Sequence, residues 1–329
     1  MRNILKKLAL LFIPVAAYFC FFCYFEPNNY FGLKETAAGT APIGRIKAFV
    51  QQPGDRLILG DSRLAHFDMA LAEKASGKEW QNLAFGGASL RETLDLLEFT
   101  LEKNPDVKEV VMGVSFYTLN AKYDTDRMSA LQDTLDNPLA YMFNLEYNIN
   151  AVTSFRNWLI WNSQVRSGAT TDTWAQAQQE TETADWAEED YLLPDGTRHA
   201  WHAKLRDYLP IIDPVITGWS VNEEQLARLL ETIRRCDEAG LSLTILLPPM
   251  HESVTGLCEE KGIAAGMAPV LAQLEETAAA CQNVQILDYE WGPLGPGMGL
   301  EEWQYFDGFH LDTSYGLPIW TEDLFGRLA

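Results

Sequence analysis

The stretch LILGDSRLAH, residues 57–66, contains the turn from which the fold can be worked out. It begins with apolar residues, as expected for a strand that is buried on both faces of a parallel sheet. A glycine ends this run, and Leu64, Phe67 and Leu71 then recur at helical spacing. We therefore predict a strand that runs directly into a helix, with Ser62 at the mouth of that helix.

Other segments share this short, apolar character. We predict strands at residues 56–60, 80–84, 108–113, 242–247 and 284–288. Two of the segments between them carry apolar stripes at helical spacing, at residues 90–101 and 226–236. Strands that alternate with helices indicate an α/β fold, here a flavodoxin-like, doubly wound parallel sheet of about five strands. Ligands bind such sheets beyond the carboxyl ends of the strands, where Ser62 is expected.

Residues 54–329 are predicted to form one domain with a large insertion. The strand–helix alternation breaks at about residues 116–219, a connection far longer than is usual between strands. This segment is rich in aromatic residues and includes an acidic stretch at residues 180–190. We predict a mostly helical insertion that caps the strand ends. Residues 31–53 are predicted to be a linker, because they contain several Pro and Gly residues.

The N-terminal segment predicts a membrane anchor. Arg2, Lys6 and Lys7 precede an uncharged apolar run at residues 8–25. This run is just long enough to span a bilayer as a helix, and its basic flank is expected to stay in the cytoplasm. We therefore predict that residues 1–30 form a single-pass anchor in the plasma membrane, with the domain on the extracellular side. A cleaved signal peptide is the alternative, although bulky residues stand where small ones precede cleavage.

Charge and residue counts argue against nucleic-acid binding, a disulfide framework and a metal site. The formal net charge of -21 argues against a nucleic-acid partner, because an acidic surface repels phosphate backbones. Of the five cysteines, Cys20 and Cys23 lie in the apolar run, and the odd number outside it argues against a disulfide framework. His199 and His202 have metal-like spacing but no third ligand nearby, so we predict no metal site and no cofactor.

A second motif gives Ser62 a possible chemical role. Serine is common at the start of a helix as an N-cap, so Ser62 alone does not indicate catalysis. The segment YFDGFHLDTSYG, near the C-terminal end, places Asp307 three residues before His310. An aspartate so placed can fix the tautomer of the imidazole, and the other ring nitrogen can then take a proton from a serine. The alternative is a solvated loop pair with no catalytic role.

These motifs resemble those of the SGNH (GDSL-like) hydrolase superfamily: GDS after the first strand, a glycine after the second, and DxxH near the C-terminus. The resemblance spans roughly residues 54–115 and 240–329. It implies that Ser62 is the nucleophile, that His310 is the base, and that Asp307 orients His310.

The same resemblance implies an oxyanion hole. The backbone N–H of Ser62 and that of Gly86 or Gly87 are the implied donors. Simple members of the superfamily carry GxND after the third strand, with the Asn side chain as a further donor. Here the corresponding run GVSFYTLN places Ser115 at the Asn position, and we predict that its hydroxyl takes over this role in part. Because losing one donor costs about 3 kcal/mol of transition-state stabilisation, this departure argues against ordinary esterase activity.

Two residues are predicted to contact substrate. Arg63 lies beside the nucleophile and could attract an anionic acceptor, the alternative being a solvated surface arginine. His251, in LLPPMHESV, follows the fourth strand and so reaches the same edge of the sheet. The alternative for His251 is a loop position without a catalytic role.

An anchored, outward-facing domain with an altered third block resembles the surface-polymer acyl-transfer proteins, such as the DltD-type teichoic-acid D-alanylation proteins and the AlgX-type alginate O-acetyltransferases. The implied partners are a cell-surface polysaccharide or teichoic acid and a multipass acyltransferase of the MBOAT type. We therefore expect an O-acyltransferase that works through a serine acyl-enzyme. Two alternatives stay open: a carbohydrate esterase of the SGNH type, and a non-catalytic scaffold or binding protein of a cell-envelope complex.

Overall fold

The computed structural model describes the backbone of residues 2–26, 28–33, 42–135, 137–171, 191–192, 198–199 and 201–329. The chain divides into two compact units. The smaller combines Met1–Ala48 with Ser129–Thr181, and the larger combines Phe49–Met128 with Glu182–Ala329.

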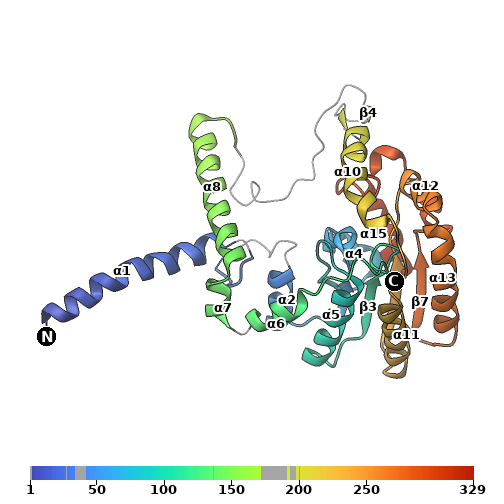
Figure 1. Ribbon diagram of the computed structural model, residues 1–329, viewed down its shortest axis with the longest axis horizontal. Coiled ribbons are helices and arrows are strands. Elements are labelled where there is room, and N and C mark those ends of the chain that lie inside the picture. The colour runs from blue at the N-terminus through green and yellow to red at the C-terminus, as the bar shows by residue number, and fades with distance from the viewer. Residues whose placement is uncertain are drawn as a thin grey trace. The chain divides into compact units, whose positions relative to one another are not determined.

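The larger unit is built on a five-stranded, all-parallel sheet (Figure 1). Its strands are β1 (Arg56–Leu59), β2 (Gln81–Asn82), β3 (Glu109–Gly113), β6 (Ser242–Leu247) and β7 (Val284–Asp288). Their order across the sheet is β2-β1-β3-β6-β7, that is, 2-1-3-4-5 in chain order. The predicted α/β fold with five parallel strands is thus confirmed, and each observed strand falls within its predicted range.

Register aligns the carboxyl ends of the central strands along one edge of the sheet. Leu59 at the end of β1 lies beside Met112 of β3, and Met112 lies beside Ile245 of β6. The loops that follow β1, β3 and β6 therefore leave the sheet side by side. Such an edge is where ligands bind in doubly wound sheets.

Helices cover both faces of this sheet. The helices of the larger unit are α3 (Ser62–Ala65), α4 (Met69–Ser76), α5 (Leu90–Lys103), α10 (Trp201–Ile216), α11 (Glu223–Glu238), α12 (Glu252–Glu260), α13 (Ile263–Ala279), α14 (Leu294–Gly297), the 3-10 helix η1 (Glu302–Gln304) and α15 (Gly316–Arg327). Helix α4 packs against α15, while α11 contacts α5 and α13 (Figure 1). With right-handed crossovers, these two sets lie on opposite faces of the sheet.

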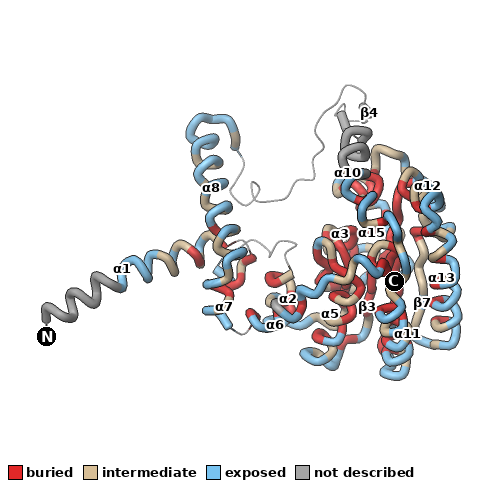
Figure 2. Tube along the Cα trace, in the orientation of Figure 1, coloured by how far each residue is buried: buried red, intermediate tan, exposed pale blue. Residues whose placement is uncertain are grey.

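The core forms where the strands meet these helices (Figure 2). Leu57, Ile58 and Leu59 of β1 are completely buried, as predicted for a central parallel strand. On one face, Phe67 packs against Trp320 and Phe325 of α15 at centroid distances of 4.9 and 5.5 Å. This packing fixes the segment that follows α3 against α15, and so it supports the Ser62 turn at the start of α3.

The smaller unit contains α1 (Arg2–Phe25), α7 (Pro138–Met142) and α8 (Leu145–Ser167), with most of α2 (Pro42–Gln51) and α6 (Met128–Leu135). An aromatic cluster joins these helices. Tyr30 stacks on Tyr141 with ring centroids 3.9 Å apart, and Phe22 of α1 meets Tyr141 edge-on at 5.6 Å. Helix α2 forms within residues 31–53, where the sequence predicts a linker, because its apolar face is buried.

Among the residues whose side chains the structure describes, no helix is long and apolar enough to cross a membrane. The span predicted at residues 8–25 lies partly outside those residues, because the side chains of residues 2–11 are not described.

The described part of the predicted insertion, residues 116–219, is mostly helical. It holds α6, α7, α8 and α10, with a small antiparallel pair of β4 (Tyr191–Leu192) and β5 (Arg198–His199). Its two ends belong to the larger unit and its middle to the smaller one. Residues 136, 172–190, 193–197 and 200 lie outside the described chain.

Candidate active site

The turn after β1 positions Ser62. Gly60 has a φ of +148°, and a Cβ there would lie 3.2 Å from the Cα of Gly113, so glycine is required where β1 and β3 approach. Asp61 then caps α3, because its Oδ1 accepts the N–H of Arg63 at 3.0 Å. Ser62 follows as the first residue of α3. The local sequence thus explains why the chain turns here.

The structure brings Ser62, His310 and Asp307 together. Ser62 Oγ lies 2.8 Å from His310 Nε2, and His310 Nδ1 lies 2.9 Å from Asp307 Oδ2. The Asp307 carboxylate also accepts the N–H groups of Phe309 and His310 at 3.0 and 2.7 Å. It is therefore held by its own loop. With Asp307 ionised, Nδ1 carries the ring proton and Nε2 can accept the proton of the serine hydroxyl.

The loop that carries the Asp–His pair is braced by the loop after β6. The N–H of His251 donates to the carbonyl of Gly308 at 2.7 Å, and the His251 ring meets Tyr305 edge-on at 5.1 Å. Burial lowers the pKa of His251. His251, predicted as a substrate contact, is instead buried as part of the support of this loop.

The turn after β2, here called the glycine turn (residues 85–88), lies next to the Ser62 turn. The N–H of Phe85 donates to the carbonyl of Gly60 at 3.0 Å, which ties the two turns together. Gly87 has a φ of +63° and so requires glycine. Within the described part of the chain, the N–H groups of Ser62, Gly86 and Gly87 have no acceptor. They include the backbone donors that the motif resemblance implies for an oxyanion hole, namely Ser62 and either Gly86 or Gly87.

The turn after β3, here called the serine turn (residues 115–118), is closed on itself. The N–H of Ser115 donates to Thr118 Oγ1 at 3.0 Å, and Ser115 Oγ accepts the N–H of Thr118 at 3.3 Å. Ser115 is 0% exposed. The predicted oxyanion donor is therefore enclosed in its own turn, and the structure does not present its hydroxyl to a substrate.

Arg63 is also enclosed. Its guanidinium bonds to Asp61 Oδ2 at 2.7 Å and to Glu290 Oε1 at 3.3 Å, and its side chain is 2% exposed. The prediction that Arg63 attracts an anionic acceptor is not supported, because the charge is neutralised and shut off from solvent. A buried guanidinium needs such partners, since an unpaired charge is costly inside a protein.

Glu290 is a residue of the site that the sequence does not reveal. It follows β7, and its Oε2 accepts the N–H of Phe116 at 3.2 Å and the indole N–H of Trp291 at 2.9 Å. Burial raises its pKa to about 8, although the Arg63 charge and the Phe116 N–H act in the opposite direction. The only available signal was its position at the carboxyl end of a strand.

Tyr208 of α10 brings the insertion to the catalytic histidine. Its ring lies 5.7 Å from the His310 ring and 6.0 Å from that of Phe309. Burial raises its pKa, and the nearby Asp307 charge adds to this shift. Aromatic residues are abundant in the insertion, so the sequence could not single out this one.

One group of side chains in the described residues could be considered as a metal site. Ligand atoms of His251, Glu252 and Glu302 lie within 4.8 Å of one another. Nδ1 of His251 lies 3.2 Å from the N–H of Ser253, which donates to it, and 2.9 Å from Ser253 Oγ. This ring nitrogen therefore serves the N-cap of α12.

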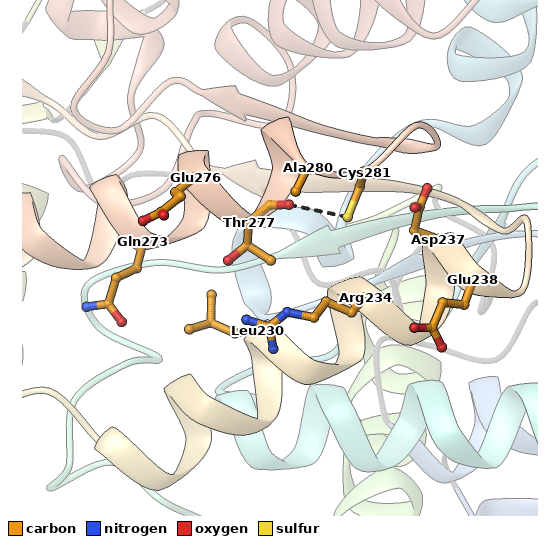
Figure 3. A pocket seen from close by; sticks show the side chains of 9 residues that line it. All are labelled: Leu230, Arg234, Asp237, Glu238, Gln273, Glu276, Thr277, Ala280 and Cys281. Atoms are coloured by element: carbon orange, nitrogen blue, oxygen red, sulfur yellow. Dashed lines mark hydrogen bonds between the residues drawn. The ribbon is translucent and has the colours of Figure 1, made fainter.

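A groove elsewhere on the larger unit is unrelated to the triad. It has a volume of about 500 Å³ and lies between α11 and α13 (Figure 3). Its lining consists of Leu230, Arg234, Asp237, Glu238, Gln273, Glu276, Thr277, Ala280 and Cys281. The ends of α11 and α13 precede β6 and β7, so the groove lies at the amino edge of the sheet. Ser62 lies at the carboxyl edge.

No protein-family model matches the chain, and no curated protein matches it.

Proposed function

We propose that the chain is a serine acyltransferase, in which Ser62 takes an acyl group from a donor and passes it to a hydroxyl of a cell-surface glycopolymer. The observation that carries this proposal is the continuous hydrogen-bond chain from Ser62 Oγ through His310 to Asp307, at 2.8 and 2.9 Å. A nucleophile, a base and a group that orients the base are what acyl transfer through serine requires.

In the first step, Ser62 Oγ attacks the carbonyl carbon of the donor while His310 Nε2 takes the hydroxyl proton. The carbonyl oxygen becomes an oxyanion, for which the N–H groups of Ser62, Gly86 and Gly87 are the available donors. The intermediate collapses to acyl-Ser62, and His310 gives its proton to the leaving group. In the second step, His310 takes the proton of an acceptor hydroxyl, whose oxygen attacks the acyl carbon. The bond to Ser62 Oγ then breaks, and His310 gives the proton back to that oxygen.

Transfer to a hydroxyl requires that water be kept from the acyl-enzyme. The contact of Tyr208 with His310 supports this requirement, because it places an aromatic ring of the insertion beside the base, at a centroid distance of 5.7 Å. The second candidate is a carbohydrate esterase, in which water takes the place of the acceptor. It is favoured by the His310 side chain, which stays 17% exposed and so within reach of water.

Other parts of the proposal rest on the sequence. The SGNH type of fold agrees with the sheet order 2-1-3-4-5 and is proposed with the function. The extracellular location, the polysaccharide or teichoic-acid acceptor and the MBOAT-type partner stay predictions. They depend on residues 8–25 and on the resemblance of the motifs.

The test is covalent labelling of the full-length chain, purified in detergent, with a fluorophosphonate probe. We expect one adduct, mapped by peptide mass spectrometry to Ser62, that is lost in Ser62→Ala and in His310→Gln. Ser167→Ala, at an exposed serine of α8, is the matched control and should be labelled like the wild type. A folded wild-type chain that takes up no probe would contradict the proposal and favour a non-catalytic scaffold.

A second assay separates the two enzymatic candidates. Wild-type chain that has not been exposed to the probe is given an activated acetyl ester, with and without an acetyl-free cell-surface polysaccharide. An acetylated polysaccharide supports transfer, whereas release of acetate at a rate that does not depend on the polysaccharide supports the esterase.

A further inference from the structure

Arg127 forms hydrogen bonds with the backbone carbonyls of the glycine turn. Arg127 Nη1 donates to the carbonyl of Gly86 at 3.2 Å, and Nη2 donates to the carbonyl of Gly87 at 2.6 Å. The Tyr123 hydroxyl donates to the same Gly87 carbonyl at 2.6 Å. Both residues come from the chain that follows β3, far from the glycine turn in sequence.

These hydrogen bonds set the direction of the backbone N–H groups in the same peptide units. The carbonyl of Gly86 and the N–H of Gly87 belong to one planar trans peptide, so they point in opposite directions. Holding the carbonyl on Arg127 therefore aims the Gly87 N–H away from Arg127. The preceding peptide is fixed similarly, because the carbonyl of Phe85 accepts the N–H of Ala88 at 3.3 Å.

Arg127 is itself held rigidly. Its Nε and Nη2 form a fork with the two carboxylate oxygens of Glu92, both at 2.8 Å. Glu92 is 0% exposed and belongs to the capping box of α5, where it accepts the N–H of Ser89 at 3.0 Å. The side chain of Arg127 is 43% exposed, but most donors of its guanidinium are used in hydrogen bonds to Glu92 and to the glycine turn.

The Glu92–Arg127 pair stays charged. Burial raises the pKa of Glu92, but the hydrogen bonds from Arg127 and from the Ser89 N–H lower it by more. The pKa of Glu92 therefore lies below its ordinary value. A cation on a peptide carbonyl also polarises that peptide and strengthens its N–H as a donor. With Ser115 enclosed, the donors left for an oxyanion are backbone N–H groups, so their aim and strength matter more.

We propose that Arg127 is a positioning residue for the oxyanion hole, which aims and polarises the N–H of Gly87 through the carbonyl of Gly86 and holds the rest of the glycine turn through the carbonyl of Gly87. This rests on the proposed function, because it assumes that an oxyanion forms at Ser62. The Tyr123 hydroxyl assists at the Gly87 carbonyl.

The first test compares Arg127→Met and Arg127→Lys in the full-length chain, with hydrolysis of p-nitrophenyl acetate as the readout. A misaimed donor lowers kcat by about 10- to 100-fold while KM changes little, because ground-state binding does not use the oxyanion hole. Lysine keeps the charge but cannot form the fork, so its kcat should lie between methionine and wild type. The rate of labelling by fluorophosphonate should fall in parallel with kcat.

The matched control is Arg91→Met, which removes the neighbouring Arg91–Asp124 ion pair but leaves the glycine turn untouched. It should keep the wild-type kcat. Equal losses in Arg91→Met and Arg127→Met, or a wild-type kcat in a folded Arg127→Met, would overturn the proposal.

The second test does not depend on activity. In a chain labelled with ¹⁵N-glycine, the Gly87 amide signal should shift or broaden in Arg127→Met and stay unchanged in Arg91→Met. An unchanged Gly87 signal in Arg127→Met would refute the positioning of the Gly87 N–H by Arg127, even if activity fell. A wild-type chain that the fluorophosphonate does not label would refute the proposed function and the catalytic role of Arg127 with it. A labelled wild type with an unaffected Arg127→Met would refute the role of Arg127 alone.

Discussion

Two neighbouring turns at the carboxyl edge of the sheet use their polar groups in opposite ways. The glycine turn binds its carbonyls to Arg127 and Tyr123 and leaves the N–H groups of Gly86 and Gly87 without an acceptor in the described chain. The serine turn joins Ser115 to Thr118 by three hydrogen bonds and buries the Ser115 side chain. A position in a motif thus does not make a residue a donor. The decisive property is whether the turn satisfies its own hydrogen bonds.

A buried carboxyl group supports each turn, Glu92 for the glycine turn and Glu290 for the serine turn. The two groups differ in charge. Glu92, behind the glycine turn, has a pKa below its ordinary value and stays ionised. Glu290 accepts the Phe116 N–H of the serine turn, and burial raises its pKa to about 8. The support of the glycine turn is therefore insensitive to pH near neutrality, whereas that of the serine turn is not.

Among variants of the two turns, the largest expected effect follows from adding a methyl group to the glycine turn. In Gly87→Ala the Cβ would lie 2.8 Å from the Tyr123 hydroxyl, and the residue would need a φ of +63°. We expect kcat to fall at least about 100-fold, as for the loss of an oxyanion donor. Gly86→Ala is the control, because its Cβ meets nothing within 4 Å, and its loss should be much smaller. Equal kinetics in the two variants would show that the conformation of Gly87 does not govern the rate.

A second prediction uses the charge of Glu290. Its pKa rises from an ordinary 4.5 in the unfolded chain to about 8 in the folded one. Between about pH 5 and pH 8 the folded state keeps a proton that the unfolded state releases, so the free energy of unfolding falls as pH rises. The loss should be on the order of a few kcal/mol and should flatten in Glu290→Gln. Urea denaturation of both chains at several pH values measures it. The same slope in both would show that Glu290 is ionised when folded.

The smallest expected effect is that of Ser115→Ala. Because the Ser115 hydroxyl serves only its own turn, we expect a loss of about 1 kcal/mol of folding free energy and a kcat within about threefold of wild type. Thermal denaturation and ester hydrolysis check the two values. A 100-fold loss of kcat with an unchanged melting temperature would identify Ser115 as an oxyanion donor and reverse the contrast between the turns.

Local patterns were enough to predict the sheet and to bring three residues together. Buried parallel strands are short apolar runs, and the turns after β1 and before α15 carry Ser62, Asp307 and His310 in recognisable motifs. The accessibility of Arg63 and Ser115 could not be predicted. It depends on Glu290 and Thr118, and sequence alone does not reveal which side chains fold inward.

The supporting residues were missed for a related reason. Arg127 follows Gly86 by 41 residues, and Tyr208 lies about a hundred residues before His310. Neither belongs to a short motif, so only the folded chain shows what they touch. The spacing of Ser89 and Glu92 fits a capping box, but the sequence does not show that Glu92 also binds Arg127.

The central claim is that Ser62 forms an acyl-enzyme, and trapping that species is its most direct test. The full-length chain is mixed with p-nitrophenyl acetate, quenched in acid within milliseconds and mapped by peptide mass spectrometry. We predict an acetyl group on Ser62 in the wild type, formation slowed by about 10³- to 10⁴-fold in Asp307→Asn, and none in Ser62→Ala. Absence of acetyl-Ser62 in a folded wild-type chain, or turnover that persists in Ser62→Ala, would contradict the account.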